Sequence, residues 1–219
     1  MKLHYHLERD NNHTLSTAIK QYSDIVPKIL CEELIEFFEE SITFRVDDHR
    51  KQATEMQLMG DPRPPAIAYT ELLYDLIYPL GTKYERELHA ECHVDYKPAD
   101  EPLTKIFPTG LRSLQIQKYT PEDEGYPAVH VESGPDHCRK YLAVIVHLND
   151  VEEGGETVFP MAGTAIQPET GKISIWPAGL PFYHCGNKSR TDKYILTSWF
   201  EFLLTKEDFL RRPSDQRTY

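Results

Sequence analysis

The pattern of apolar residues changes near Leu111, and this change constrains the fold more than any other feature. Before it, apolar residues recur at helical spacing in two stretches, Ser23–Ser41 and Tyr69–His89. After it, short apolar runs alternate with turn-forming residues, a pattern typical of β-strands. Helices followed by many short strands predict an α+β fold, mainly β, in which the helices support one face of a sheet.

The strands are expected in the second half of the chain. They are Arg112–Tyr119, Tyr141–Asn149, Glu156–Phe159, Lys172–Trp176 and Lys193–Phe202. Short strands at regular spacing predict a sandwich, a barrel or a jelly roll. In the helical half, we expect Pro27 in the first turn of the first helix, and Pro79 and Gly81 to kink or split the second.

Two stretches that contain several prolines interrupt these patterns, residues 46–66 and residues 93–110. We expect both to be loops, which serve either as lids or as solvated linkers. A chain of 219 residues is long enough for one sizeable domain and short for two. We therefore expect one domain over residues 1–219, with helices and loops over 1–110 supporting a β-core over 111–204.

Composition excludes some classes of partner. The chain has 35 acidic against 24 basic residues and a formal net charge of −11, whereas a nucleic-acid partner would need a basic face. Neither a signal peptide nor an apolar run long enough to cross a membrane is visible, so we expect no membrane partner. The four cysteines form no CxxC pair, which favours reduced thiols in the cytoplasm.

Two H-x-D/E pairs compete as the start of a metal site, His93-Val-Asp95 and His130-Val-Glu132. Residues two apart on a strand point to the same side, so both side chains of such a pair can face one cavity. Together with a distant histidine they would form the two-histidine, one-carboxylate set that suits iron(II). His93 enters a proline-containing loop, whereas His130 lies among the strands. This context favours the second pair.

An ordered series of motifs runs from Leu114 to Phe202. It includes Gly125-Tyr-Pro-Ala-Val-His-Val-Glu132, Val151-Glu-Glu-Gly-Gly-Glu-Thr-Val-Phe-Pro160, Gly171-Lys-Ile-Ser-Ile-Trp-Pro177 and Lys193-Tyr-Ile-Leu-Thr-Ser-Trp-Phe200. This series resembles the 2-oxoglutarate- and iron(II)-dependent dioxygenases, and it is closest to the prolyl 4-hydroxylase group. The resemblance implies a double-stranded β-helix (jelly roll) preceded by supporting helices.

The same resemblance implies a metal site. It makes His130 the first metal ligand and His184 the distal histidine, with Glu132 standing where the family usually has aspartate. Glutamate keeps the negative charge and the oxygen donor but is longer by one methylene. Because halogenating relatives have no carboxylate at this position, the resemblance implies hydroxylation in place of halogenation.

The resemblance also implies residues that bind the cosubstrate. Lys193 would pair with the distal carboxylate of 2-oxoglutarate, because a dianion in a low-dielectric barrel requires a fixed cation. Tyr119 and His147 match positions that contact the cosubstrate, and packing in the core is the alternative for both. The implied cofactors are iron(II), 2-oxoglutarate as cosubstrate, and ascorbate as the reductant that rescues oxidised iron.

The expected reaction consumes O2 and hydroxylates a substrate with release of succinate and CO2. The leading hypothesis is a prolyl 4-hydroxylase-like enzyme that acts on a peptide or protein. A second hypothesis is an oxygenase that acts on another residue or on a small molecule. A third, of another class, is a non-catalytic jelly-roll protein that binds a metal or a sugar, in which Lys193 would have no cosubstrate to pair with.

Overall fold

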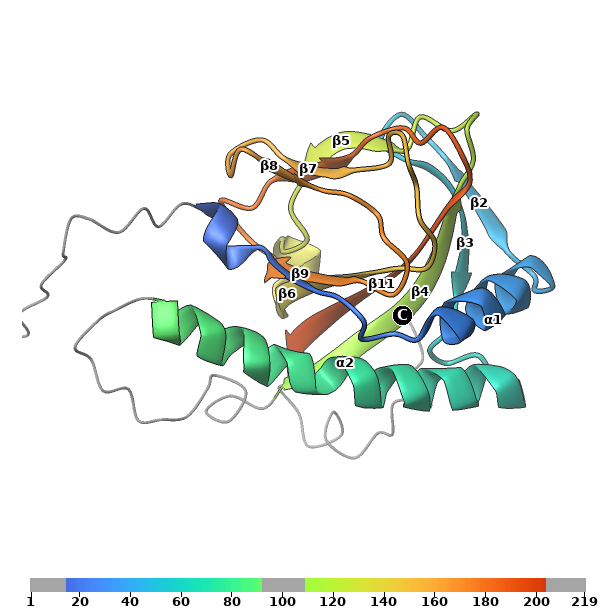
Figure 1. Cartoon of the computed structure of the whole chain (residues 1–219), viewed down its shortest axis with the longest axis horizontal. Coiled ribbons are helices and arrows are strands. Elements are labelled where there is room, and N and C mark those ends of the chain that lie inside the picture. Colours follow the sequence, from blue (N-terminus) through green and yellow to red (C-terminus); the bar gives the residue numbers. More distant parts are fainter. Residues whose placement is uncertain (1–14, 92–108, 204–219) are drawn as a thin grey trace, which may run out of the picture.

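The structure is a computed structural model that describes residues 15–91 and 109–203 (Figure 1). The described ranges contain two α-helices and two short 3-10 helices. They are α1 (Lys28–Glu39), α2 (Pro64–Glu91), η1 (Leu15–Ala18) and η2 (Pro135–His137). Both α-helices pack on the same side of the larger of two β-sheets. In the described ranges, no helix is both long enough and apolar enough to cross a bilayer.

All strand pairs in the two sheets are antiparallel. The major sheet has the order β1-β9-β6-β11-β4-β3-β2. Its strands are β1 (Lys20–Tyr22), β2 (Phe44–Asp47), β3 (Gln52–Gln57), β4 (Thr109–Tyr119), β6 (Lys140–His147), β9 (Ile173–Pro177) and β11 (Lys193–Phe202). The minor sheet has the order β5-β10-β7-β8. Its strands are β5 (Tyr126–His130), β7 (Thr157–Phe159), β8 (Thr164–Ile166) and β10 (His184–Gly186). The sheets face each other as the two layers of a jelly roll (Figure 1).

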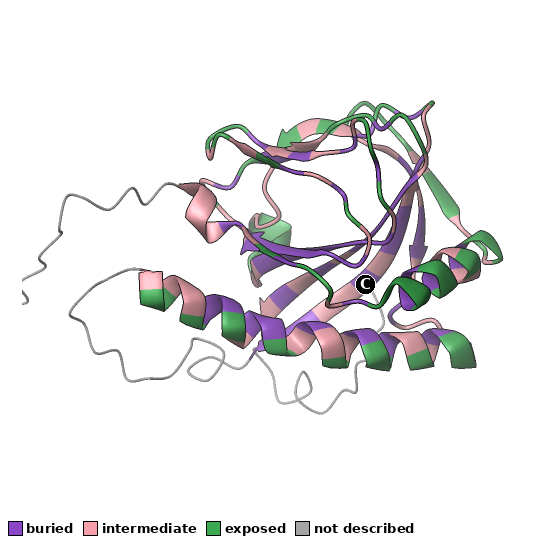
Figure 2. Cartoon of the chain, in the orientation of Figure 1, coloured by how far each residue is buried: buried purple, intermediate pink, exposed green. Residues whose placement is uncertain are grey.

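Strand β6 shows how the sequence pattern divides the core. Val144 and Val146 point toward the helices, while Ala143 and Ile145 point into the space between the sheets and pack with Trp176. The helices in turn bury one face each and expose the other (Figure 2). Burying one such aliphatic side chain contributes roughly 1.5–3 kcal/mol, so the major sheet is stabilised from both faces.

The second helix is longer than expected and is not split. α2 begins at Pro64, where proline is tolerated because the first turn lacks intrahelical N–H partners, and it continues through Pro79 to Glu91. Gly81 serves packing: a Cβ atom there would lie 2.6 Å from Cε1 of Phe200 on β11. The apolar contact with the major sheet therefore sustains the helix where local propensity predicted a break. The first helix, α1, begins one residue after Pro27, which occupies the N-cap.

The prediction of a loop over residues 46–66 is wrong for most of that range. β2 and β3 form a hairpin in its place, and β3 pairs with β4 at the edge of the major sheet. The pattern hid these strands because β3 turns a polar side chain, Glu55, toward the interior. The other expected loop, residues 93–110, lies outside the described residues except for its last two, which begin β4.

The expected strands are confirmed, with boundaries that shift by one or a few residues. Besides β2 and β3, four further strands were not expected: β1, β5, β8 and β10. Three of them are 3 residues long and the fourth has 5, which is too short for an alternating pattern to be recognised. Two of these short strands, β5 and β10, carry His130 and His184.

Candidate metal centre and cosubstrate cavity

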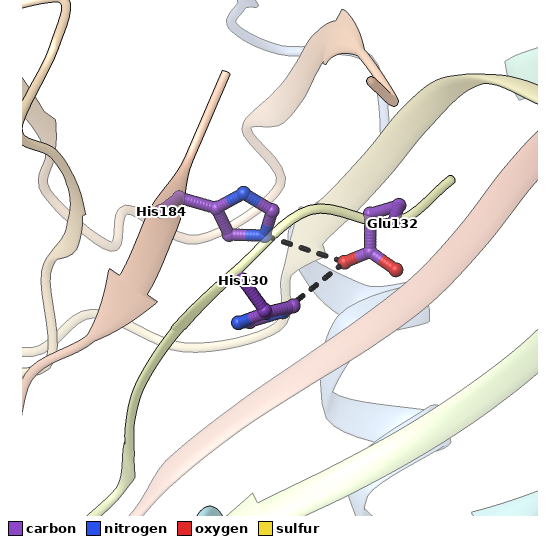
Figure 3. A group of neighbouring side chains, drawn as sticks. All are labelled: His130, Glu132 and His184. Carbon is purple, nitrogen blue, oxygen red and sulfur yellow. Dashed lines mark hydrogen bonds and ion pairs between the residues drawn. The ribbon is translucent and has the colours of Figure 1, made fainter. Parts of the chain in front are cut away.

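Two neighbouring strands of the minor sheet carry the histidines of the expected site. β5 ends at His130, β10 begins at His184, and the pairing of these strands places the two residues opposite each other. Glu132 follows β5, and its backbone N–H donates to the carbonyl of Ala178 at 2.9 Å. One donor atom from each side chain lies within 4.8 Å of the other two (Figure 3). The structure thus brings together the three residues that the sequence predicted.

Backbone carbonyls orient both histidines. Nδ1 of His130 lies 2.9 Å from the carbonyl of Ala128, and Nδ1 of His184 lies 3.1 Å from that of Phe182. Because a carbonyl can only accept, both Nδ1 atoms donate, and a neutral imidazole then has its lone pair on Nε2. The Nε2 atoms lie 3.6 Å (His130) and 3.3 Å (His184) from Oε1 of Glu132. Two imidazole nitrogens and a carboxylate oxygen converge, which is a donor set that fits iron(II).

The carboxylate of Glu132 is held in its charged form. Burial by itself would raise its pKa, but hydrogen bonding with His130 and His184 in their protonated form, the charge of protonated His184, and the charge of Lys140 hold the pKa well below the ordinary glutamate value. The second oxygen, Oε2, accepts a hydrogen bond of 2.9 Å from the indole N–H of Trp199 on β11. Each carboxylate oxygen therefore has its own set of neighbours.

A cavity of about 170 Å³ opens beside these three residues, between the two sheets. Lys193, the first residue of β11, lines it and is buried. Its ammonium donates to the carbonyl of Gly155 at 2.9 Å, and among the described residues it forms no ion pair with a carboxylate. Burial lowers the pKa of Lys193 to about 8, with the charge of Lys51 acting in the same direction and that of Glu156 opposing it. The cavity thus holds a donor triad and an unpaired buried cation.

The sequence between residues 114 and 201 matches the 2OG-Fe(II) oxygenase superfamily. The matched segment is the β-core of this chain, and it includes the triad and Lys193. Among curated proteins, none matches the sequence.

Several solved oxygenase structures share the fold. A Pseudomonas putida prolyl-4-hydroxylase superimposes with a TM-score of 0.63 at 14% identity, over 87% of this chain and 96% of that one. A viral collagen prolyl hydroxylase from Paramecium Bursaria Chlorella virus-1 superimposes with a TM-score of 0.56 at 18% identity, over 85% of this chain and 97% of that one. A Trichoplax adhaerens prolyl hydroxylase superimposes with a TM-score of 0.58 at 12% identity, over 87% of this chain and 88% of that one. The fold of this chain is thus similar to that of solved prolyl hydroxylases.

Tyr119 and His147 differ in their relation to the cavity. Tyr119 lines it, with the ring 4.8 Å from Nζ of Lys193, and its hydroxyl donates to Oε1 of Gln117 at 2.7 Å. His147 is buried, and neither of its ring nitrogens has a hydrogen-bond partner among the described residues. Burial, with the charges of Lys193 and Lys172, lowers the pKa of His147 to about 3, so this imidazole is neutral.

The cavity residues that the sequence did not predict include Lys51, Gln115, Gln117 and Tyr126. Lys51 lies in a segment that was expected to be a loop. The two glutamines lie on β4 at alternate positions with Tyr119, so they face the same side, and this alternation of polar residues was a usable signal. Tyr126 stacks on the ring of His130, with centroids 4.0 Å apart.

The competing pair, His93 and Asp95, lies outside the described residues. The preference for the His130 pair over it therefore stays a prediction. Trp176 packs in the interior between the sheets, whereas Trp199 is half-buried and lines the cavity.

Proposed function

We propose that this chain is a 2-oxoglutarate- and iron(II)-dependent dioxygenase in which His130, Glu132 and His184 hold iron(II). The observation that carries the proposal is the convergence of two Nε2 atoms and one carboxylate oxygen at the wall of a cavity. Such a set binds iron(II) on one face and leaves adjacent positions open. When bound, iron(II) with 2-oxoglutarate and O2 supplies the hydroxylation of a C–H bond, and succinate and CO2 are released.

Lys193 binds the distal carboxylate of 2-oxoglutarate in this proposal. Its ammonium is buried and lacks a carboxylate partner among the described residues, so a carboxylate that enters the cavity gains a strong attraction. Ile145 and Ile195 line the same cavity with apolar surface, which excludes water and strengthens that attraction. We assign Tyr119 and His147 to the same subsite. Tyr119 borders the cavity, and the charge of Lys193 contributes to lowering the pKa of His147.

We propose a prolyl residue of a peptide or protein as the substrate. The support is the likeness of fold to solved prolyl hydroxylases, one of which is in complex with a peptide fragment of the hypoxia inducible factor oxygen degradation domain. Ascorbate as the reductant and a cytoplasmic location belong to the same proposal. A matched assay with and without ascorbate tests the first, because sustained turnover without any reductant would contradict it.

The assay is succinate formation from 2-oxoglutarate with a library of proline-containing peptides. We expect turnover only with iron(II), and none in His130→Ala or His184→Ala. Mass spectrometry then decides the substrate: an oxygen added to proline supports the proposal, and an oxygen on another residue or only on small molecules favours the alternative oxygenase. Full activity of His130→Ala would contradict the assignment of His130 as a metal ligand.

A thermal-shift measurement separates an oxygenase from a non-catalytic binding protein. A ligand that binds only the folded state raises the midpoint of unfolding. In the unaltered protein, we expect 2-oxoglutarate together with manganese(II) to raise this midpoint. In Lys193→Ala, we expect manganese(II) to raise the midpoint and 2-oxoglutarate to have no effect on it. No effect of 2-oxoglutarate on either protein would favour the non-catalytic alternative.

A further inference from the structure

The chain has two tryptophans, and they stand in opposite relations to the metal site. The indole N–H of Trp199 donates to Oε2 of Glu132 at 2.9 Å. The ring of Trp176 packs edge-on against His184 at 5.1 Å between centroids, but its N–H has no hydrogen-bond partner among the described residues. Only one of two neighbouring indoles therefore acts on the carboxylate.

The hydrogen bond from Trp199 gives the two carboxylate oxygens of Glu132 different surroundings. Oε1 faces Nε2 of both histidines, whereas Oε2 is turned toward β11 and accepts the indole N–H (Figure 3 shows the first of these contacts). A hydrogen bond to a charged acceptor is among the stronger ones in proteins, so Oε2 is not free to move toward a cation. One oxygen of the pair is left for a metal ion.

The indole itself is fixed by two features of the major sheet. The pairing of β11 with β4 shifts register between Thr197 and Trp199, and irregularities of this kind re-aim a side chain next to a site. The ammonium of Lys140 on the adjacent strand β6 lies 3.4 Å from the centre of the Trp199 ring. A cation over an aromatic face is attracted to it, which holds the ring in place.

We propose that Trp199 is a positioning residue that restricts Glu132 to binding the metal through a single oxygen. This rests on the proposed function. A glutamate has the reach to bring both oxygens to one cation, and doing so would occupy an additional coordination position that cosubstrate and O2 require. The indole N–H prevents this by holding Oε2. The longer glutamate can thereby serve in a position that the shorter aspartate usually fills.

The test replaces each indole by a phenyl ring and measures the bound metal ion, without turnover. Manganese(II) is added to metal-free protein, its dissociation constant is measured by calorimetry, and its coordinated waters are counted by electron spin-echo spectroscopy. A three-ligand site leaves about three waters on a six-coordinate ion. We expect Trp199→Phe to bind about 10-fold more weakly, as loss of an outer-shell partner typically does, and to retain one water fewer because Oε2 joins the metal.

Trp176→Phe is the matched control, since the same atoms are removed from an indole that touches His184 but not Glu132. We expect its water count to equal that of the unaltered protein. A water count in Trp199→Phe equal to that of the control overturns the inference and leaves the proposed metal site intact. Failure of the unaltered protein to bind manganese(II) overturns both.

A second measurement applies if Trp199→Phe does not fold, which thermal unfolding would reveal. In the unaltered protein loaded with zinc(II), the indole N–H of Trp199 should exchange with solvent slowly, because it stays bonded to Oε2. Rapid exchange of that N–H in the zinc-loaded protein overturns the inference.

Discussion

The two sheets contribute to the cavity in different ways. The minor sheet supplies both histidines from β5 and β10, which are 5 and 3 residues long, and His130 is half-buried there. The major sheet supplies Lys193 and Trp199 from β11, a strand of 10 residues in which most side chains are buried. The two histidines thus lie on short strands, with His130 half-buried and His184 buried, and Lys193 lies inside the core of the fold.

The difference follows from what each group must do. A metal site needs an open approach and gains its own energy from the metal, so its strands can be short and weakly buried. A cation that attracts a dianion must be kept from water, which costs free energy that the surrounding core has to offset. Substitutions in the minor sheet should therefore affect function alone, whereas those in the major sheet should affect function and stability in opposite directions.

The largest expected effect is on turnover by His130→Ala. Succinate formation should fall below detection, because one of three metal ligands is lost. The free energy of unfolding of the metal-free protein should change by less than about 1 kcal/mol, as is usual for a partly exposed side chain. Denaturant unfolding measures this, and a large loss of stability would break the contrast between the sheets.

Lys193→Met should raise the stability of the metal-free protein while it abolishes binding of 2-oxoglutarate. At pH 7 the folded protein holds a buried ammonium whose pKa is lowered to about 8 from 10.5, so the unfolded state holds the proton more tightly. At roughly 1.4 kcal/mol for each unit of pKa, removing the charge stabilises the metal-free protein by up to roughly 3 kcal/mol.

This gain should be complete below about pH 8 and should fade as the pH rises toward 10.5, where both states lose the proton. Binding of 2-oxoglutarate should be abolished in the same variant, which calorimetry measures. A variant that is less stable than the unaltered protein at pH 7 would show that packing around the lysine outweighs the cost of its charge.

His147 gives the major sheet a distinct pH response. Its pKa is lowered to about 3 from 6.5, so between these values the unfolded chain binds a proton that the folded protein does not. Stability should therefore fall as the pH is lowered from 6.5 toward 3, by at most about 1.4 kcal/mol per pH unit from this group. His147→Phe should flatten that slope in metal-free protein, and an unchanged slope would mean that other groups cause it.

Glu132→Asp should have the smallest effect. Aspartate keeps the negative charge and the oxygen donor, so we expect measurable succinate formation and a metal affinity reduced by less than about 100-fold. Titration with manganese(II) measures the affinity. Complete loss of metal binding would show that the cavity is shaped around the longer side chain.

Some of these features could be predicted from the sequence because they depend on local pattern or on ordered motifs. The β11 strand was readable from its apolar run, and His130, Glu132, His184 and Lys193 from the motif series. The β2–β3 hairpin was not readable, because a charged residue, Glu55, is buried on β3 and breaks the usual alternation.

The sequence by itself determined the two α-helices, the five strands that were expected in the second half of the chain, and the residue types that a metal and an anion require. Only the tertiary structure decided that α2 runs unbroken through Pro79, because contact with the major sheet outweighs local propensity. It also decided that Trp199, and not Trp176, holds Oε2 of Glu132. Residues 67 positions apart meet there through strand register and an irregularity in β11, which no local pattern encodes.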